Sequence, residues 1–128
     1  MPCEVAVSPF FIACQEGYAE VVSLLLADVR IHFNEPKEEG ATPFNIACCS
    51  GQRDVVSLLL ADVRIEINEP DNAQCTPLWM ASQEGQLPVV QFILASGREV
   101  DTKTKSLDGH EWNNTTAAEI AFLSGIKD

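Results

Sequence analysis

The chain repeats itself at an interval of 34 residues. The run VVSLLLADVRI occupies residues 21–31 and returns without a substitution at residues 55–65. A third copy starts at Thr76, and a partial fourth copy starts at Thr116. Periods of roughly 20 to 50 residues are typical of solenoids and propellers, in which stacking on neighbours buries the apolar face that a single unit leaves open. The period therefore predicts a stack of small units.

Each unit reads as two short helices followed by a polar turn. In the second unit, Thr42 is placed to cap the first helix, and Pro43 suits the first turn, where the N–H that proline lacks has no helical partner. Gly51 stands where a chain leaves a helix through a left-handed residue. The second helix, residues 54–60, has apolar positions too dense for one stripe, which predicts burial between two neighbours. The polar segments between units are predicted to project as turns: residues 34–41 and 68–75.

Two segments carry a recognisable pattern, TPFNIACCSG…VVSLLL and TPLWMASQEG…VVQFIL. They resemble the ankyrin repeat, whose pattern is T-P-L-H-x-A-x-x-x-G…V-V-x-L-L-L. The resemblance extends from about Ser8 to Gly125 and implies an all-α solenoid of stacked antiparallel helix pairs with projecting turns. About three and a half repeats are expected in a single domain over residues 1–128, at about 8–41, 42–75, 76–115 and, in part, 116–128.

The resemblance also implies a protein–protein interaction module. In this family partners meet the turn tips and the exposed positions of the first helix, on the concave side. Carried over one position at a time, the expected contact residues are Gln15, Glu16, Glu38, Glu39, Ala41, Cys49, Ser50, Asn72, Ala73, Cys75, Gln83 and Glu84.

A further set of candidates comes from the position of the family's motif histidine, which Phe11, Asn45, Trp79 and Glu119 occupy here. Asn45 and Trp79 are added to the predicted contact surface. Trp79 is the predicted anchor, because tryptophan is over-represented among interface residues that carry binding energy. The alternative is that Phe11 and Trp79 fill space between repeats.

Charge predicts the chemistry of the partner. The chain has 19 acidic and 8 basic side chains, so its formal net charge is −11. Such a surface repels nucleic acid and anionic lipid. Several of the expected contact residues are acidic and none is basic, which favours a protein partner with a basic surface. The alternative is that the carboxylates only keep the solenoid soluble.

Two segments are unusual for this pattern. Residues 103–113 form an insert in the third turn and contain Trp112, a further contact candidate, although the insert could also be a loop without a partner. At the other end, Phe10 and Phe11 open the first unit with no polar cap before them. This predicts a segment of a longer array, self-association through a Phe10/Phe11 face, or an end that packs adequately alone.

Catalysis has little support in the sequence. The two histidines, His32 and His110, lie in different turns, and no phosphate-binding loop, catalytic serine motif or metal-binding spacing occurs. We therefore expect no enzyme, no cofactor and no metal. Five cysteines without a C-x-x-C pair, no basic lead before the first apolar residues and no long apolar stretch predict a cytoplasmic protein.

A different role is that of a substrate. Asn34 and Asn68 occupy the turn asparagine that, in some ankyrin proteins, an asparaginyl hydroxylase modifies. Asn68 is the better match of the two. The alternative is that both asparagines only stabilise the repeat through local hydrogen bonds.

Overall fold

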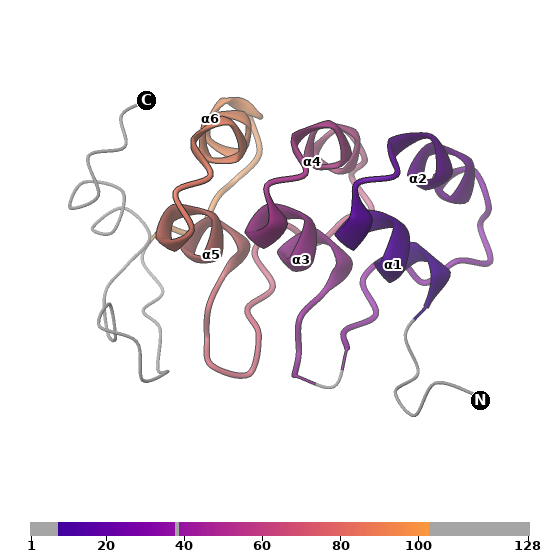
Figure 1. Ribbon diagram of the computed structural model, residues 1–128, viewed down its shortest axis with the longest axis horizontal. Coiled ribbons are helices and arrows are strands. Elements are labelled where there is room, and N and C mark those ends of the chain that lie inside the picture. The colour runs from indigo at the N-terminus through magenta and orange to yellow at the C-terminus, as the bar shows by residue number, and fades with distance from the viewer. Residues whose placement is uncertain (1–7, 38, 103–128) are drawn as a thin grey trace.

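The computed structural model describes residues 8–37 and 39–102, and within this part of the chain the secondary structure is helical, without strands. The helices are α1 (Pro9–Glu16), α2 (Ala19–Leu26), α3 (Pro43–Ser50), α4 (Arg53–Leu60), α5 (Pro77–Gln83) and α6 (Leu87–Ala95). In Figure 1, α1, α3 and α5 lie side by side in one row, and α2, α4 and α6 form a second row above it. The all-α solenoid of helix pairs predicted from the repeat is confirmed.

The first helix of each repeat is bounded as its sequence predicts. The hydroxyl oxygen of the capping residue accepts the backbone N–H three residues later at 3.0–3.1 Å, and proline occupies the first turn. The three caps are Ser8, Thr42 and Thr76. At the other end, Gly17 and Gly51 adopt left-handed backbone angles, with φ of 79° and 74°. Local sequence alone therefore sets these helix boundaries.

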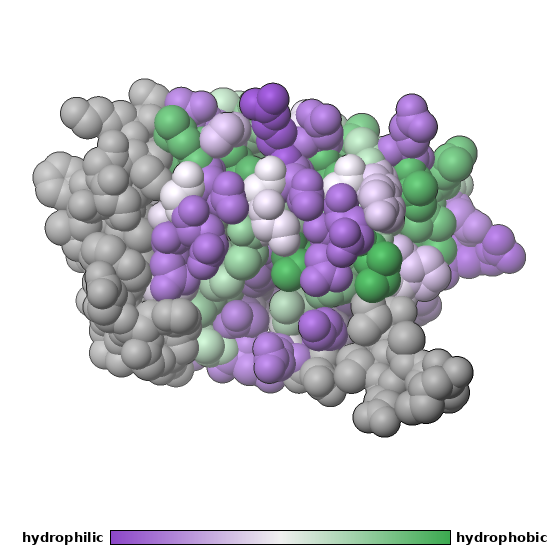
Figure 2. Space-filling view, viewed as in Figure 1, coloured by the Kyte–Doolittle hydropathy of each residue, from purple (hydrophilic) through white to green (hydrophobic). Residues whose placement is uncertain are grey.

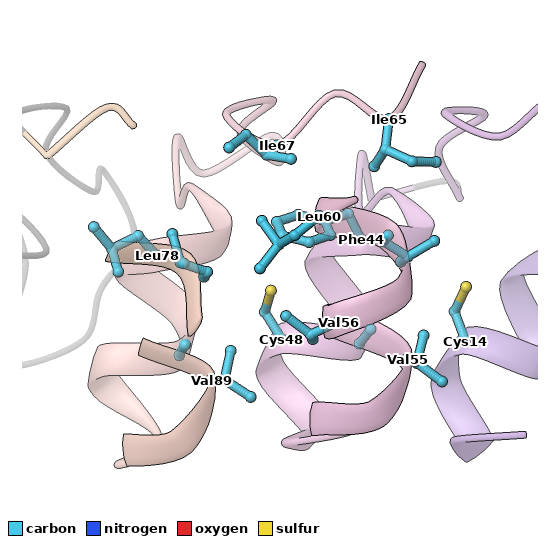
Figure 3. Close-up of a cluster of buried hydrophobic side chains, with 14 of the residues drawn as sticks. Cys14, Phe44, Cys48, Val55, Val56, Leu60, Ile65, Ile67, Leu78 and Val89 are labelled. Atoms are coloured by element: carbon cyan, nitrogen blue, oxygen red, sulfur yellow. The ribbon is translucent and has the colours of Figure 1, made fainter. Parts of the chain in front are cut away.

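The core lies between the repeats. Helix α4 is buried on two sides, as its dense apolar pattern predicts, because it packs against α2 on one side and α6 on the other. Figure 3 shows Val55 directed toward Cys14 of the first repeat, whereas Val56 lies on the side of α4 that faces Cys48 of α3 and Val89 of α6. All five of these side chains are buried. Each repeat therefore completes the core of its neighbour.

The second helix of the first two repeats ends without glycine. Asp62 instead organises the chain after α4: its carboxylate accepts the Arg64 backbone N–H at 3.0 Å and two guanidinium N–H bonds at 2.9 and 2.6 Å. The same Arg64 donates from Nη2 to the carbonyl oxygen of Leu26 at 2.8 Å. This turn thus closes one repeat and holds the end of α2 in the preceding repeat.

We expect Asp62→Asn to lower the free energy of unfolding by about 1 kcal/mol at neutral pH, because partly exposed ion pairs contribute little. Hydrogen bonds from the Arg64 side chain, ahead of the backbone bond, lower the pKa of Asp62 from 3.8 to about 2. A depressed pKa stabilises the fold above the unfolded-state pKa. The difference between parent and variant should therefore shrink as pH falls from 3.8 toward 2.

Urea unfolding at several pH values measures this difference. Asp28→Asn is the matched control, because Asp28 binds Arg30 in the same way, but within the described residues Arg30 reaches no other repeat. A loss for Asp62→Asn that stayed constant down to pH 2.5 would show that the carboxylate charge is not the stabilising element.

The structure corrects the prediction that Phe10 and Phe11 form an exposed face for self-association. Both side chains are buried. The Phe10 ring meets the edge of Phe33 with ring centroids 5.2 Å apart, and the Lys37 ammonium lies 5.7 Å from the Phe11 ring centroid. The two phenylalanines therefore belong to the packing of the first repeat and cannot present a self-association surface.

Candidate interaction surface

The three helices of the lower row in Figure 1, α1, α3 and α5, each expose one face to solvent. On α1 this face carries Ile12, Gln15 and Glu16, which share it because residues three and four apart in a helix are neighbours. Ile12 is 41% exposed, Glu16 is exposed and Gln15 is partly buried. The face therefore combines an apolar, an amide and a carboxylate side chain.

The same three positions recur on the next two repeats, beside those of α1. We call the set the inner face: Ile12, Gln15 and Glu16; Ile46, Cys49 and Ser50; Met80, Gln83 and Glu84. α1 packs against α3, and α3 against α5, so equivalent positions lie in rows across the stack. Figure 2 shows hydrophobic and hydrophilic side chains side by side on the surface turned toward the viewer. The structure thus brings together Gln15, Glu16, Cys49, Ser50, Gln83 and Glu84, as expected from sequence.

One row of this surface was absent from the sequence-based prediction. Ile12, Ile46 and Met80 form an apolar row that is exposed in the first repeat and partly buried in the next two. A signal for it was present, because an apolar residue precedes the small alanine of the pattern in all three repeats. The sequence-based prediction covers the two positions before the repeat glycine, the turn tips and the motif-histidine position, and leaves this row out.

The turns between repeats, residues 34–41 and 68–75, lie beside one another below the row formed by α1, α3 and α5 (Figure 1). We call their outer ends the turn tips. The backbone N–H of Asn72 donates to the carbonyl oxygen of Glu39 at 3.1 Å, which links the second turn to the first. Gly40 makes this approach possible: its φ is +82°, and a Cβ there would lie 2.6 Å from Oδ1 of Asn72. Glu39 and Asn72 are both exposed, so these predicted contact residues are accessible. Glu38 lies outside the described residues.

Two carboxylates lie near Cys49, which belongs to the middle repeat of the inner face. Burial, and after it the nearby charges of Glu84 and Asp71, raise the pKa of the Cys49 thiol. The two carboxylates come from α5's end and from the second turn, so they approach Cys49 from different elements. At the margin of this surface, Lys37 turns its ammonium over the Phe11 ring. The surroundings of Cys49 therefore include two carboxylates.

Three predicted contact residues are buried, which corrects their assignment to a partner surface. Trp79 is 0% exposed, and Asn45 and Cys75 are also buried. Asn45 donates from Nδ2 to the carbonyl oxygen of Cys75 at 3.2 Å and so links two repeats. The position of the motif histidine therefore points into the stack, and a residue there serves packing or a bond between repeats.

Trp112 and its insert, residues 103–113, lie outside the described residues, as does the partial fourth repeat. Asn68 lies within the described residues, and its side-chain amide makes two hydrogen bonds. Nδ2 donates to the carbonyl oxygen of Glu99 and Oδ1 accepts the backbone N–H of Asp101, each at 2.8 Å. Asn68 therefore links the turn after the second repeat to the backbone of the third repeat. Hydroxylation of Asn68 stays a prediction.

Among residues 8–37 and 39–102, no group of three or more histidine, cysteine, aspartate or glutamate side chains could hold a metal ion. No helix there has both the length and the apolar character needed to cross a bilayer. The described cysteines are free thiols: Cys14, Cys48, Cys49 and Cys75.

Comparison with known families agrees with the geometry. A family model for ankyrin repeats matches residues 10–104 in three copies, which is more than half of the chain. The matched residues include the inner face and the two turn tips. A comparison with curated proteins finds no match.

Proposed function

The chain belongs to the ankyrin repeat family, and we propose that it binds a basic protein partner through the inner face and the turn tips. Ankyrin repeats are in general protein–protein interaction modules, and the family is typically non-catalytic. The proposal adds the location of the contact surface and the chemistry of the partner.

The observation that carries the proposal is that exposed carboxylates recur on the inner face and at a turn tip. Glu16 and Glu84 are exposed at the same position of the first and third repeats, and Glu39 is exposed at the first turn tip. After burial, the charges of Glu84 and Asp71 both raise the pKa of the Cys49 thiol. Complementary charge raises association rates and rejects like-charged competitors, so a segment rich in lysine or arginine fits this surface.

The apolar row adds a second requirement. Ile12, Ile46 and Met80 lie among the polar positions of the inner face and would lose contact with water when covered. Burial of apolar surface supplies affinity, whereas the surrounding charges supply orientation and selectivity. We therefore propose that the partner segment carries apolar side chains flanked by basic ones.

Selection from a random peptide display library tests the proposal without a known partner. We expect selected peptides to be rich in lysine and arginine. The double variant Glu16→Lys/Glu84→Lys should weaken binding of the strongest selected peptide at least about tenfold, which corresponds to about 1.4 kcal/mol. Isothermal titration calorimetry at low and high salt measures the affinities, and salt should weaken the parent's binding.

The matched control is Glu20→Lys/Asp54→Lys, which makes the same change in net charge at exposed positions in the first turns of α2 and α4. This variant should retain the affinity of the parent within about twofold. If both double variants lost binding equally, general attraction between opposite net charges would explain the data. Selection of acidic or purely apolar peptides would contradict the basic partner.

A further inference from the structure

One exposed position on the inner face carries a carboxylate in the first and third repeats but not in the second. It is Glu16 at the end of α1, Ser50 at the end of α3 and Glu84 directly after α5, and all three residues are exposed. Because α3 packs against α1 on one side and α5 on the other, these residues form one row across the stack (Figure 1). We call it the carboxylate row, and it presents two negative charges with a neutral hydroxyl between them.

Both charges of the carboxylate row are available to a partner. Within the described residues, no hydrogen bond or ion pair occupies the side chain of Glu16 or Glu84. Asp71 of the second turn instead uses Oδ1 to accept the backbone N–H groups of Ala73 and Cys75, each at 2.9 Å, and so holds its own turn. A segment that crosses the inner face therefore meets Glu16 near one end and Glu84 near the other.

Hydrogen bonds between repeats hold these charges at a set distance. Gln52 donates from Nε2 to the carbonyl oxygen of Gln15 at 2.9 Å, and Gln86 donates in the same way to that of Cys49 at 3.0 Å. Each accepting carbonyl belongs to the residue directly before a member of the carboxylate row. Packed helices have axes about 8–10 Å apart, so positions two repeats apart are separated by about 16–20 Å.

An extended chain matches this separation at one particular spacing. Such a chain rises about 3.3 Å per residue, and its alternate side chains point to the same face. Side chains six residues apart therefore share a face and lie about 20 Å apart, whereas side chains five residues apart point to opposite faces. A helix rises only about 1.5 Å per residue and would need about eleven to thirteen residues for the same separation.

The apolar row runs parallel to the carboxylate row. Its members, each four residues before a member of the carboxylate row, are Ile12, Ile46 and Met80. Residues four apart in a helix are neighbours on one face, so the two rows lie side by side. An extended segment over these rows turns two further side chains toward the surface between its outer contacts. Apolar side chains fit there, because they remove the apolar row from water.

We infer that the inner face binds its basic partner segment in an extended conformation across α1, α3 and α5, with two basic side chains six residues apart on Glu16 and Glu84. The residues two and four positions after the first basic one are apolar and lie over the apolar row. Charge complementarity selects this occupant, since a segment with its basic side chains on opposite faces would leave one carboxylate unpaired. The inference rests on the proposed function, to which it adds the conformation and the spacing of the partner.

Synthetic peptides of equal length and composition test the spacing. Each contains two lysines and two isoleucines among threonines, which favour an extended chain. The lysines are six residues apart in one peptide and five residues apart in the other. NMR titration of the full chain gives the dissociation constants, and we expect the six-residue spacing to bind about threefold more tightly, because it gains one exposed ion pair. A helical, alanine-rich peptide with lysines eleven residues apart should bind more weakly than the six-residue spacing.

Glu84→Gln removes one carboxylate and keeps the shape of the side chain. This variant should bind the two extended peptides equally, because only Glu16 remains in the row to pair with a lysine. Glu66→Gln is the matched control: Glu66 is exposed on the segment after α4, outside the inner face, so this variant should keep the preference of the parent.

Equal binding of the two extended peptides to the parent would overturn the inference, as would tighter binding of the helical peptide. A preference that persisted in Glu84→Gln would also overturn it, because pairing with Glu84 would then not be its cause. These three results would leave the basic partner in place, since peptides with lysines would still bind. If none of the three peptides bound, the result would contradict the proposed function together with the inference.

Discussion

Replacing Trp79 with alanine is expected to lower the free energy of unfolding by about 3–5 kcal/mol, the usual cost of removing a buried aromatic side chain from a packed core. The side chain of Trp79 is 0% exposed and stands at the start of α5. Small domains have a total stability of about 5–15 kcal/mol, so this loss would remove a large share of it.

Urea unfolding followed by circular dichroism measures the loss, and Phe92→Ala is the control. Phe92 is also an aromatic side chain of the third repeat, but it is 39% exposed on α6, so its removal should cost about 1 kcal/mol. Equal and small losses would mean that Trp79 is not a core residue. The hypothesis that Trp79 anchors a partner would then regain support.

The second large effect is expected for Gly51→Ala, at about 2–3 kcal/mol. The left-handed angle of Gly51, φ +74°, costs an L residue about 1–2 kcal/mol. An added Cβ would also lie 2.4 Å from Oε1 of Gln86. Gln86 donates to the carbonyl oxygen of Cys49 at 3.0 Å, and displacing it would lose a bond between repeats worth about 1 kcal/mol.

Gly85→Ala separates the two contributions. Gly85 has nearly the same angle, φ +70°, but a Cβ there would meet nothing within 4 Å. Its substitution should therefore cost only the backbone strain, about 1–2 kcal/mol. Thermal or urea unfolding of both variants gives the difference. Equal losses would show that the contact between Gly51 and Gln86 contributes nothing measurable.

The helix pairs could be predicted because their signals are local. A hydroxyl cap followed by proline, as at Thr42 and Pro43, satisfies or removes orphan N–H groups whatever surrounds it. Gly51 ends α3 because few other residues adopt its backbone angle without strain. The repeat period then requires that the units stack, since none of them can bury its own apolar face.

The candidate site could be predicted only in part. Glu16 and Glu84 are exposed as expected, because their positions within the helix face away from the core. Trp79 and Asn45 are not, because the repeat position they share points between the helices, and pattern alone did not distinguish an anchor from a packing residue. Ile12, Ile46 and Met80 form one apolar row only because the fold places α1, α3 and α5 side by side.

By itself, therefore, the sequence determined that the chain forms capped helix pairs that stack at a regular period. The tertiary structure decided which copy of an identical sequence is covered. Val21 and Val55 have the same local sequence, as have Arg30 and Arg64, yet one member of each pair is exposed and the other is packed or bonded against a preceding repeat. Burial depends on the neighbour that a residue meets in space, and no local pattern contains that information.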